Sequence, residues 1–195
     1  MDDDEFDWAR KRQRRAELAR WTMELLKTLP LPDVIKAVDE RRRDADGDDY
    51  RALTMDLSFF LCAAGRESEA VPIIDEMIAR LPDDVRFPIR KALLLLSSMN
   101  DPGKALEAIE VALVRAHRTG FFRREALGVK ARILLQLGHG DQLSQTLEEI
   151  MALEMKRDIP DSGRERDFVD RAPPGMIRED VLARYNVFCP REDSD

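Results

Sequence analysis

The chain has 195 residues, enough for one domain with a buried core or for a short solenoid. Its formal net charge of −7 at pH 7 argues against nucleic acid or an anionic membrane as the partner of the whole chain. Charged residues make up 36% of the sequence and glycines number only nine, which favours helices over loops. We therefore expect an all-α protein without strands.

The N-terminus and the cysteines indicate a cytoplasmic protein. The sequence begins Met-Asp-Asp-Asp-Glu, without the basic start and apolar centre of a secretory signal. Apolar runs such as residues 92–96 are far too short to cross a bilayer. Cys62 and Cys189 lie far apart in the sequence, and neither has a second cysteine or a histidine nearby. We expect both thiols to be reduced and not to bind metal.

Residues 1–50 are predicted to form an N-terminal helical hairpin, which is a candidate degenerate repeat. The first helix has Leu18, Trp21, Thr22 and Leu25 on one face, and the second has Val34 and Val38. Basic runs occur at residues 11–15 and 41–43. The first run follows acidic residues on the same helix, and the second closes a helix whose C-terminal dipole favours cations. We interpret both runs as solvated helix faces and expect no nucleic-acid binding.

An acidic cluster at residues 44–49 resembles a calcium loop only superficially. Gly47 follows the second acid directly, so the alternating ligands of an EF-hand are missing. The sequence instead predicts a polar turn with Asp48 or Asp49 as the helix N-cap.

A helical-hairpin pattern repeats three times within residues 51–155. In each copy an apolar helical face precedes a turn, and a second apolar face follows it. The first faces are Leu57, Ser58 and Leu61, then Ile89, Ala92, Leu93 and Leu96, then Leu127, Ala131 and Leu134. The second faces are Ala70, Ile74 and Met77, then Ala105, Ile109 and Ala112, then Leu143, Leu147 and Ile150. Equivalent positions recur roughly every 35 residues, the length of a hairpin repeat.

The first of these hairpins resembles a tetratricopeptide repeat. The resemblance is carried by Leu57, Ser58, Leu61, Gly65, Ala70, Ile74, Met77 and Pro82. The second copy has one inserted residue, and the third has Leu143 where the family favours a small residue. The resemblance implies a short α-solenoid of antiparallel hairpins over residues 51–155.

The last segment, residues 156–195, changes character. Its first part is charged and rich in helix breakers, which predicts a loop. A short amphipathic helix is then predicted by Met176, Ile177, Val181, Leu182 and Tyr185. Because the end of a solenoid exposes an apolar flank, we assign this helix a capping role.

Signals for catalysis are missing from the sequence. His117 and His139 are the only histidines, and the second lies in a Gly-His-Gly turn with no partner imidazole or thiolate. The sequence contains no Gly-x-Ser-x-Gly elbow, phosphate-binding loop or dinucleotide fingerprint. We therefore expect no enzyme activity, no cofactor and no metal.

The resemblance implies a concave groove lined by the first helix of each hairpin. By register, the groove residues are Met55, Phe59, Phe87, Arg90, Lys91, Leu94, Arg132 and Gln136. Three cations beside two phenylalanines would suit a peptide or helix with acidic and apolar side chains. Met55, Phe59 and Leu94 fit equally well in the core.

These features favour a non-catalytic protein-protein interaction module, such as an adaptor or a small chaperone. A secretion-chaperone-like or immunity-type inhibitor protein is an alternative of the same class. A regulatory or enzyme subunit whose site forms only in a complex is the alternative from another class.

Overall fold

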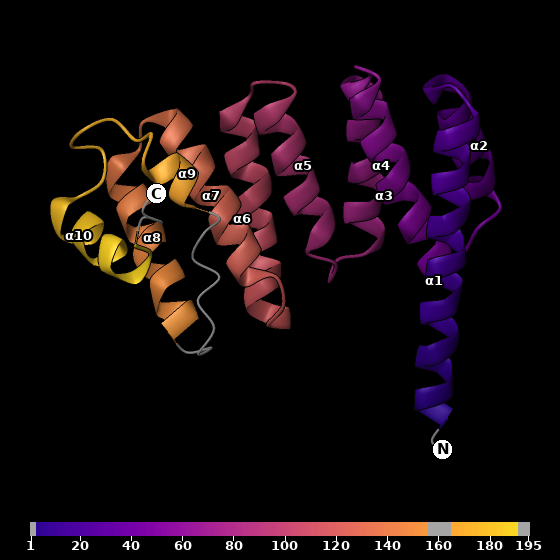
Figure 1. Cartoon of the computed structure of the whole chain (residues 1–195), viewed down its shortest axis with the longest axis horizontal. Helices are drawn as coiled ribbons and strands as arrows, with labels where there is room; N and C mark the ends of the chain where they lie inside the picture. Colours follow the sequence, from indigo (N-terminus) through magenta and orange to yellow (C-terminus); the bar gives the residue numbers. More distant parts are fainter. Residues whose placement is uncertain (1–2, 156–164, 191–195) are drawn as a thin grey trace, which may run out of the picture. The chain divides into compact units, whose positions relative to one another are not determined.

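The computed structural model describes residues 3–155 and 165–190, and within these ranges it contains ten α-helices and no strand (Figure 1). The prediction of an all-helical protein is confirmed. The chain divides into two compact units, Met1–Leu81 and Pro82–Asp195. This boundary falls inside the segment 51–155, between the first predicted hairpin and the second. In the described ranges, no helix is both long and apolar enough to cross a membrane.

The first unit consists of α1 (Asp3–Thr28), α2 (Leu31–Arg43), α3 (Gly47–Ala63) and α4 (Glu67–Arg80). Helix α1 packs on α2 and α3, and α3 packs on both α2 and α4. The N-terminal half of α1 runs past the ends of α2 and α3 (Figure 1). The predicted apolar faces form the interior: the buried side chains include Leu18, Val34, Val38, Leu57, Leu61, Ala70, Ile74 and Met77.

The boundary between α2 and α3 differs from the prediction. Asp46 is the residue that precedes the helix, in an extended conformation and without a side-chain capping bond. Asp48 and Asp49 lie inside the first turn of α3, so neither is the N-cap. Gly47 has a positive φ of 49°, in the left-handed region that favours glycine, so the backbone turns there before the regular part of the helix. The two carboxylates still lie where the helix dipole favours negative charge.

The second unit contains α5 (Arg86–Ser97), α6 (Pro102–Thr119), α7 (Arg123–Leu137), α8 (Gly140–Met155), α9 (Arg166–Val169) and α10 (Glu179–Phe188). From α5 to α8 each helix packs on the next, and α5 also packs on α7. Pro102 begins α6, where a proline is well tolerated, and Asp101 caps this helix by accepting a hydrogen bond from the Lys104 amide. The buried alanines at positions 105, 108, 112 and 116 allow α6 to lie close to its neighbours.

The described part of the last segment, residues 165–190, is called the C-terminal segment below. Helix α10 packs on α8, and the predicted apolar residues Ile177, Val181 and Tyr185 are buried there. A second short helix, α9, lies in a stretch predicted to be a loop. Its Phe168 and Val169 belong to the same buried cluster. Burial of these two side chains stabilises a helical turn that the charged residues and helix breakers around it would not predict. The rest of the predicted loop, residues 156–164, lies outside the described residues.

Candidate functional site

The residues predicted to line a groove come from both units. Met55 and Phe59 lie on α3 of the first unit. The other six lie on α5 and α7 of the second unit, and these two helices pack on each other. We call the surface formed by Arg90, Lys91, Arg132 and Gln136 the α5–α7 face.

Two of the predicted groove residues are in the interior. Phe87 has 0% and Leu94 has 2% of its surface exposed, so neither side chain is available at the surface of the described chain. Arg90 and Lys91 are half-buried, whereas Arg132 and Gln136 are exposed. In the second unit, the predicted groove residues that reach solvent are therefore polar or cationic. The aromatic residue predicted there, Phe87, is not among them.

A side-chain hydrogen bond joins the C-terminal end of α7 to the residues that follow α5, at one edge of the α5–α7 face. Gln136 Nε2 donates to Asn100 Oδ1 at 2.8 Å, and Asn100 follows α5 with a positive φ of 50°. One turn earlier on α7, Arg132 makes no hydrogen bond or ion pair with any described residue. Its neighbour Lys130 is paired with Glu110 at 2.7 Å. Arg132 therefore offers a cation that a ligand could bind.

The two groove residues of the first unit differ from each other. Phe59 is 59% exposed and packs edge-to-face on Phe60, with ring centroids 6.3 Å apart. Met55 is half-buried. On the same helix, Asp56 accepts a 3.4 Å hydrogen bond from Thr22 of α1. Burial raises the pKa of the Asp56 carboxyl above its ordinary 3.8, although the Thr22 bond and the charge of Arg15 oppose this shift.

A buried charge centre that sequence reasoning missed joins α7, α8 and the C-terminal segment. Arg124 Nη1 donates to Glu165 Oε1 at 2.8 Å, and the guanidinium also pairs with Glu154. All three side chains are buried, and Glu154 Oε2 has no hydrogen-bond partner among the described residues. Burial alone would lower the pKa of the Arg124 guanidinium, but its bonds to the two carboxylates raise it overall.

Gly128 makes this charge centre possible. A Cβ at position 128 would lie only 2.7 Å from Glu165 Oε1 and 3.3 Å from Arg124 Nη1. A glycine in the middle of a helix usually marks such a close approach, and this was the available sequence signal. Nothing in the local sequence pointed to Glu165, which lies in a charged stretch distant from α7.

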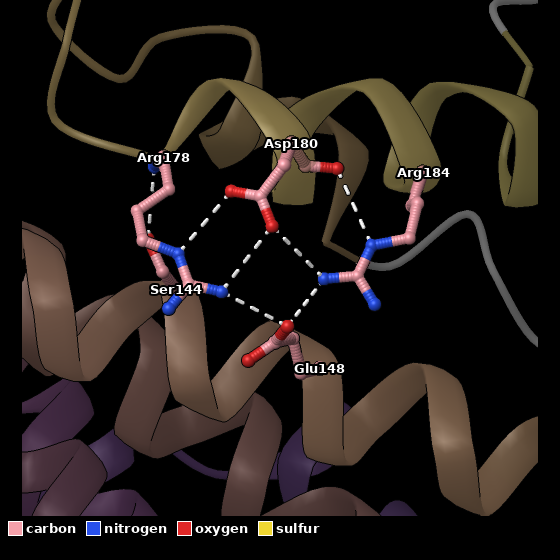
Figure 2. Close-up of polar contacts among 5 residues, drawn as sticks. All are labelled: Ser144, Glu148, Arg178, Asp180 and Arg184. Atoms are coloured by element: carbon pink, nitrogen blue, oxygen red, sulfur yellow. Dashed lines mark hydrogen bonds and ion pairs between the residues drawn. The ribbon is translucent and has the colours of Figure 1, made fainter.

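A second polar cluster joins the C-terminal segment to α8 at the surface (Figure 2). Arg178 donates from its backbone amide to Ser144 Oγ and from its guanidinium to Glu148, both at 3.0 Å. Arg184 also pairs with Glu148, and Asp180 lies between the two arginines, 3.3 Å from Arg178 Nε and 3.4 Å from Arg184 Nη2. Each of the two arginines is therefore paired with both carboxylates, those of Glu148 and Asp180. We assign this cluster to holding α10 in place.

The remaining reactive side chains considered in the sequence analysis are two histidines and two cysteines. Within the described residues, no three His, Cys, Asp or Glu side chains are placed to hold a metal ion. Both histidines are exposed. Cys62 Sγ donates to the Ser58 carbonyl at 2.9 Å, and Cys189 is buried beside Tyr185. Burial, followed by the charges of Cys189 and Glu165, raises the pKa of the Tyr185 phenol.

Comparisons with known proteins add no identification. The chain matches no protein-family model, no curated protein and no solved structure.

Proposed function

We propose that this chain is a non-catalytic protein-interaction module whose α5–α7 face binds an acidic segment of another protein. One observation carries the proposal: Arg90, Lys91 and Arg132 occur on two helices that pack on each other, in a chain of net charge −7. A carboxylate of the ligand would pair with Arg132, which makes no hydrogen bond or ion pair with any described residue. Charges at such a surface mainly accelerate encounter and select the partner.

The repeat interpretation belongs to the same proposal. The helices of the pairs α3 and α4, α5 and α6, and α7 and α8 contact each other, which supports three hairpins as the repeating units. Stacked hairpins of this kind present one helix of each pair to a ligand. In this scheme the C-terminal segment, which packs on α8, is the cap, and the protein works in the cytoplasm.

Burial of Phe87 and Leu94 sets the expected strength of binding. Without an exposed aromatic anchor on this face, electrostatic attraction supplies most of the binding free energy. Such attraction weakens as salt shortens the Debye length. The proposed complex is therefore salt-sensitive and forms quickly.

Position-specific photo-cross-linking in the cells that express the protein tests the proposal. A photoreactive amino acid at Gln136, on the α5–α7 face, should yield a cross-linked protein that mass spectrometry identifies. The same group at Glu107, an exposed position on α6, is the matched control and should not yield it. Reversing Arg90 and Arg132 to Glu should abolish the product. Equal cross-linking from both positions, or a product that survives the reversal, would reject this face as the binding site.

A further inference from the structure

Helix α1 has one face in the interior of the first unit. Leu18 and Thr22 are buried, and the Thr22 hydroxyl lies within hydrogen-bond distance of both the Leu18 carbonyl and Asp56 of α3. Trp21 is half-buried under the guanidinium of Arg41, which lies 4.2 Å from the ring centroid. This face accounts for the packing of α1 on α2 and α3.

A different face of α1 carries apolar side chains that no described residue covers. Met23 is 55% and Leu26 is 40% exposed, and the exposed Ala16 and Ala19 precede them. Successive members of this set are three, four and three positions apart, the spacing of a heptad seam in paired helices. We call these four residues the α1 seam. Small residues at one end and larger ones at the other allow close approach of a second helix.

The positions beside the α1 seam are basic or uncharged. The heptad positions that flank the seam are occupied by Gln13, Arg15, Arg20, Thr22 and Lys27. Arg20 lies along the helix, with Nε 3.4 Å from the Ala16 carbonyl, and Lys27 makes a 3.5 Å exposed ion pair with Glu24. Exposed pairs of this kind are weak and yield readily to a new partner.

This charge pattern disfavours a second copy of the chain as the occupant. Two α1 helices paired through their seams would place Arg15, Arg20 and Lys27 of one copy against the same basic set of the other, whether parallel or antiparallel. Like charges across a seam destabilise a pair of helices. A helix with acidic residues beside its own apolar seam would instead place negative charges against Arg15, Arg20 and Lys27.

We propose that the α1 seam binds an amphipathic helix of another protein whose apolar stripe is flanked by glutamate or aspartate. The site lies on the first unit and does not depend on the α5–α7 face. It occupies about two to three turns of helix, so the complex is small and transient. Electrostatic attraction to Arg20 and Lys27 sets its specificity, and Met23 and Leu26 supply the apolar contact.

Two synthetic helices of about three heptads test this inference with the full-length chain. Both carry leucine at every seam position, and they differ only in having Glu or Lys at the flanking positions. Fluorescence anisotropy should show the full chain binding the Glu-flanked helix at least roughly tenfold more tightly than the Lys-flanked one.

Two variants locate the binding. Met23→Ser with Leu26→Ser should weaken binding of the Glu-flanked helix roughly tenfold or more, because it removes the apolar contact. Arg20→Glu with Lys27→Glu should reverse the preference between the two helices. Val114→Ser removes an apolar side chain of α6 that is 72% exposed, and it is the control that should change nothing. Each variant alters exposed residues, and a melting temperature equal to the parent's confirms that it is folded.

Other outcomes overturn the inference. Equal binding of the two helices, no binding of either, or a preference unaffected by the charge reversal would show that the α1 seam does not select an acidic helix. Sedimentation that reveals a dimer of the chain, dissociated by the Met23 and Leu26 variant, would identify a second copy as the occupant instead.

Discussion

Replacing Gly140 with alanine tests how the C-terminal segment is attached. A Cβ on this first residue of α8 would overlap the carbonyl oxygen of Met176 and lie 3.2 Å from its carbonyl carbon. Both are backbone atoms, so rotation of a side chain cannot relieve the clash. The backbone must move away from α8 instead, and Arg178, two residues later, then loses its 3.0 Å bond to Ser144.

The expected loss follows from two opposing effects. Overpacking a tight contact costs about 1–3 kcal/mol. Alanine gains at most about 1 kcal/mol over glycine in a helix, and less at a first residue. We therefore expect Gly140→Ala to lower the free energy of unfolding by about 1–2 kcal/mol in urea denaturation. Hydrogen exchange should accelerate in residues 165–190 more than in α5 and α6, because the displaced segment opens locally.

Gly103→Ala is the matched control. Gly103 lies in the first turn of α6, and its added Cβ would meet only Asp101 Oδ1, at an ordinary 3.7 Å. This variant should equal the parent or exceed it by up to about 1 kcal/mol. If both alanine variants unfold alike and exchange in residues 165–190 is unchanged, the reasoning about the Gly140 contact is wrong.

The remaining predictions concern the interior. Ala70→Leu should destabilise the fold by about 1–3 kcal/mol in thermal unfolding, because the completely buried alanine has no space for a larger side chain; a variant that melts like the parent would contradict this. Arg124→Met should cost about 3–5 kcal/mol at pH 7, since two buried carboxylates lose their cation. Glu154→Gln with Glu165→Gln in the same variant should recover part of the loss, because no unpaired charge then stays buried, and a variant without recovery would refute the role of charge. Burial raises the pKa of the Asp56 carboxyl, so the unfolded chain loses the proton of this carboxyl at a lower pH than the folded chain does. The free energy of unfolding should therefore fall as the pH rises from 3.8 through the raised pKa of the folded chain. Asp56→Asn should therefore gain stability relative to the parent as pH increases through that window, and parallel pH profiles would exclude the effect.

Helical faces were predictable because burial follows helical periodicity. Ala70, Ile74 and Met77 recur at three- and four-residue spacing, and all three are buried in α4. Local turn chemistry was less informative. Aspartates occur at positions 46, 48 and 49, all are acceptable as caps, and the structure has Asp46 in that place.

The candidate site was harder to predict because exposure depends on neighbours far away in the sequence. Helix α5 is apolar at four successive positions from Leu93 to Leu96, so periodicity alone does not decide which side chains face outward. Phe87 and Leu94 were placed in a groove, and both are buried. The charge centre at Arg124 brings together residues from three segments. Nothing in a single sequence indicates which charged residues from distant segments will pair.

The most direct test of the central claim is the association rate of the cross-linked partner, measured on a biosensor as a function of salt. If the α5–α7 face attracts an acidic ligand, Arg90→Glu with Arg132→Glu should slow association on the order of tenfold or more at low salt and flatten its salt dependence. The melting temperature has to be measured beside each rate, because Arg90 is half-buried and its Nε is buried. A folded variant that captures the partner at the parent's rate at low salt would contradict the claim.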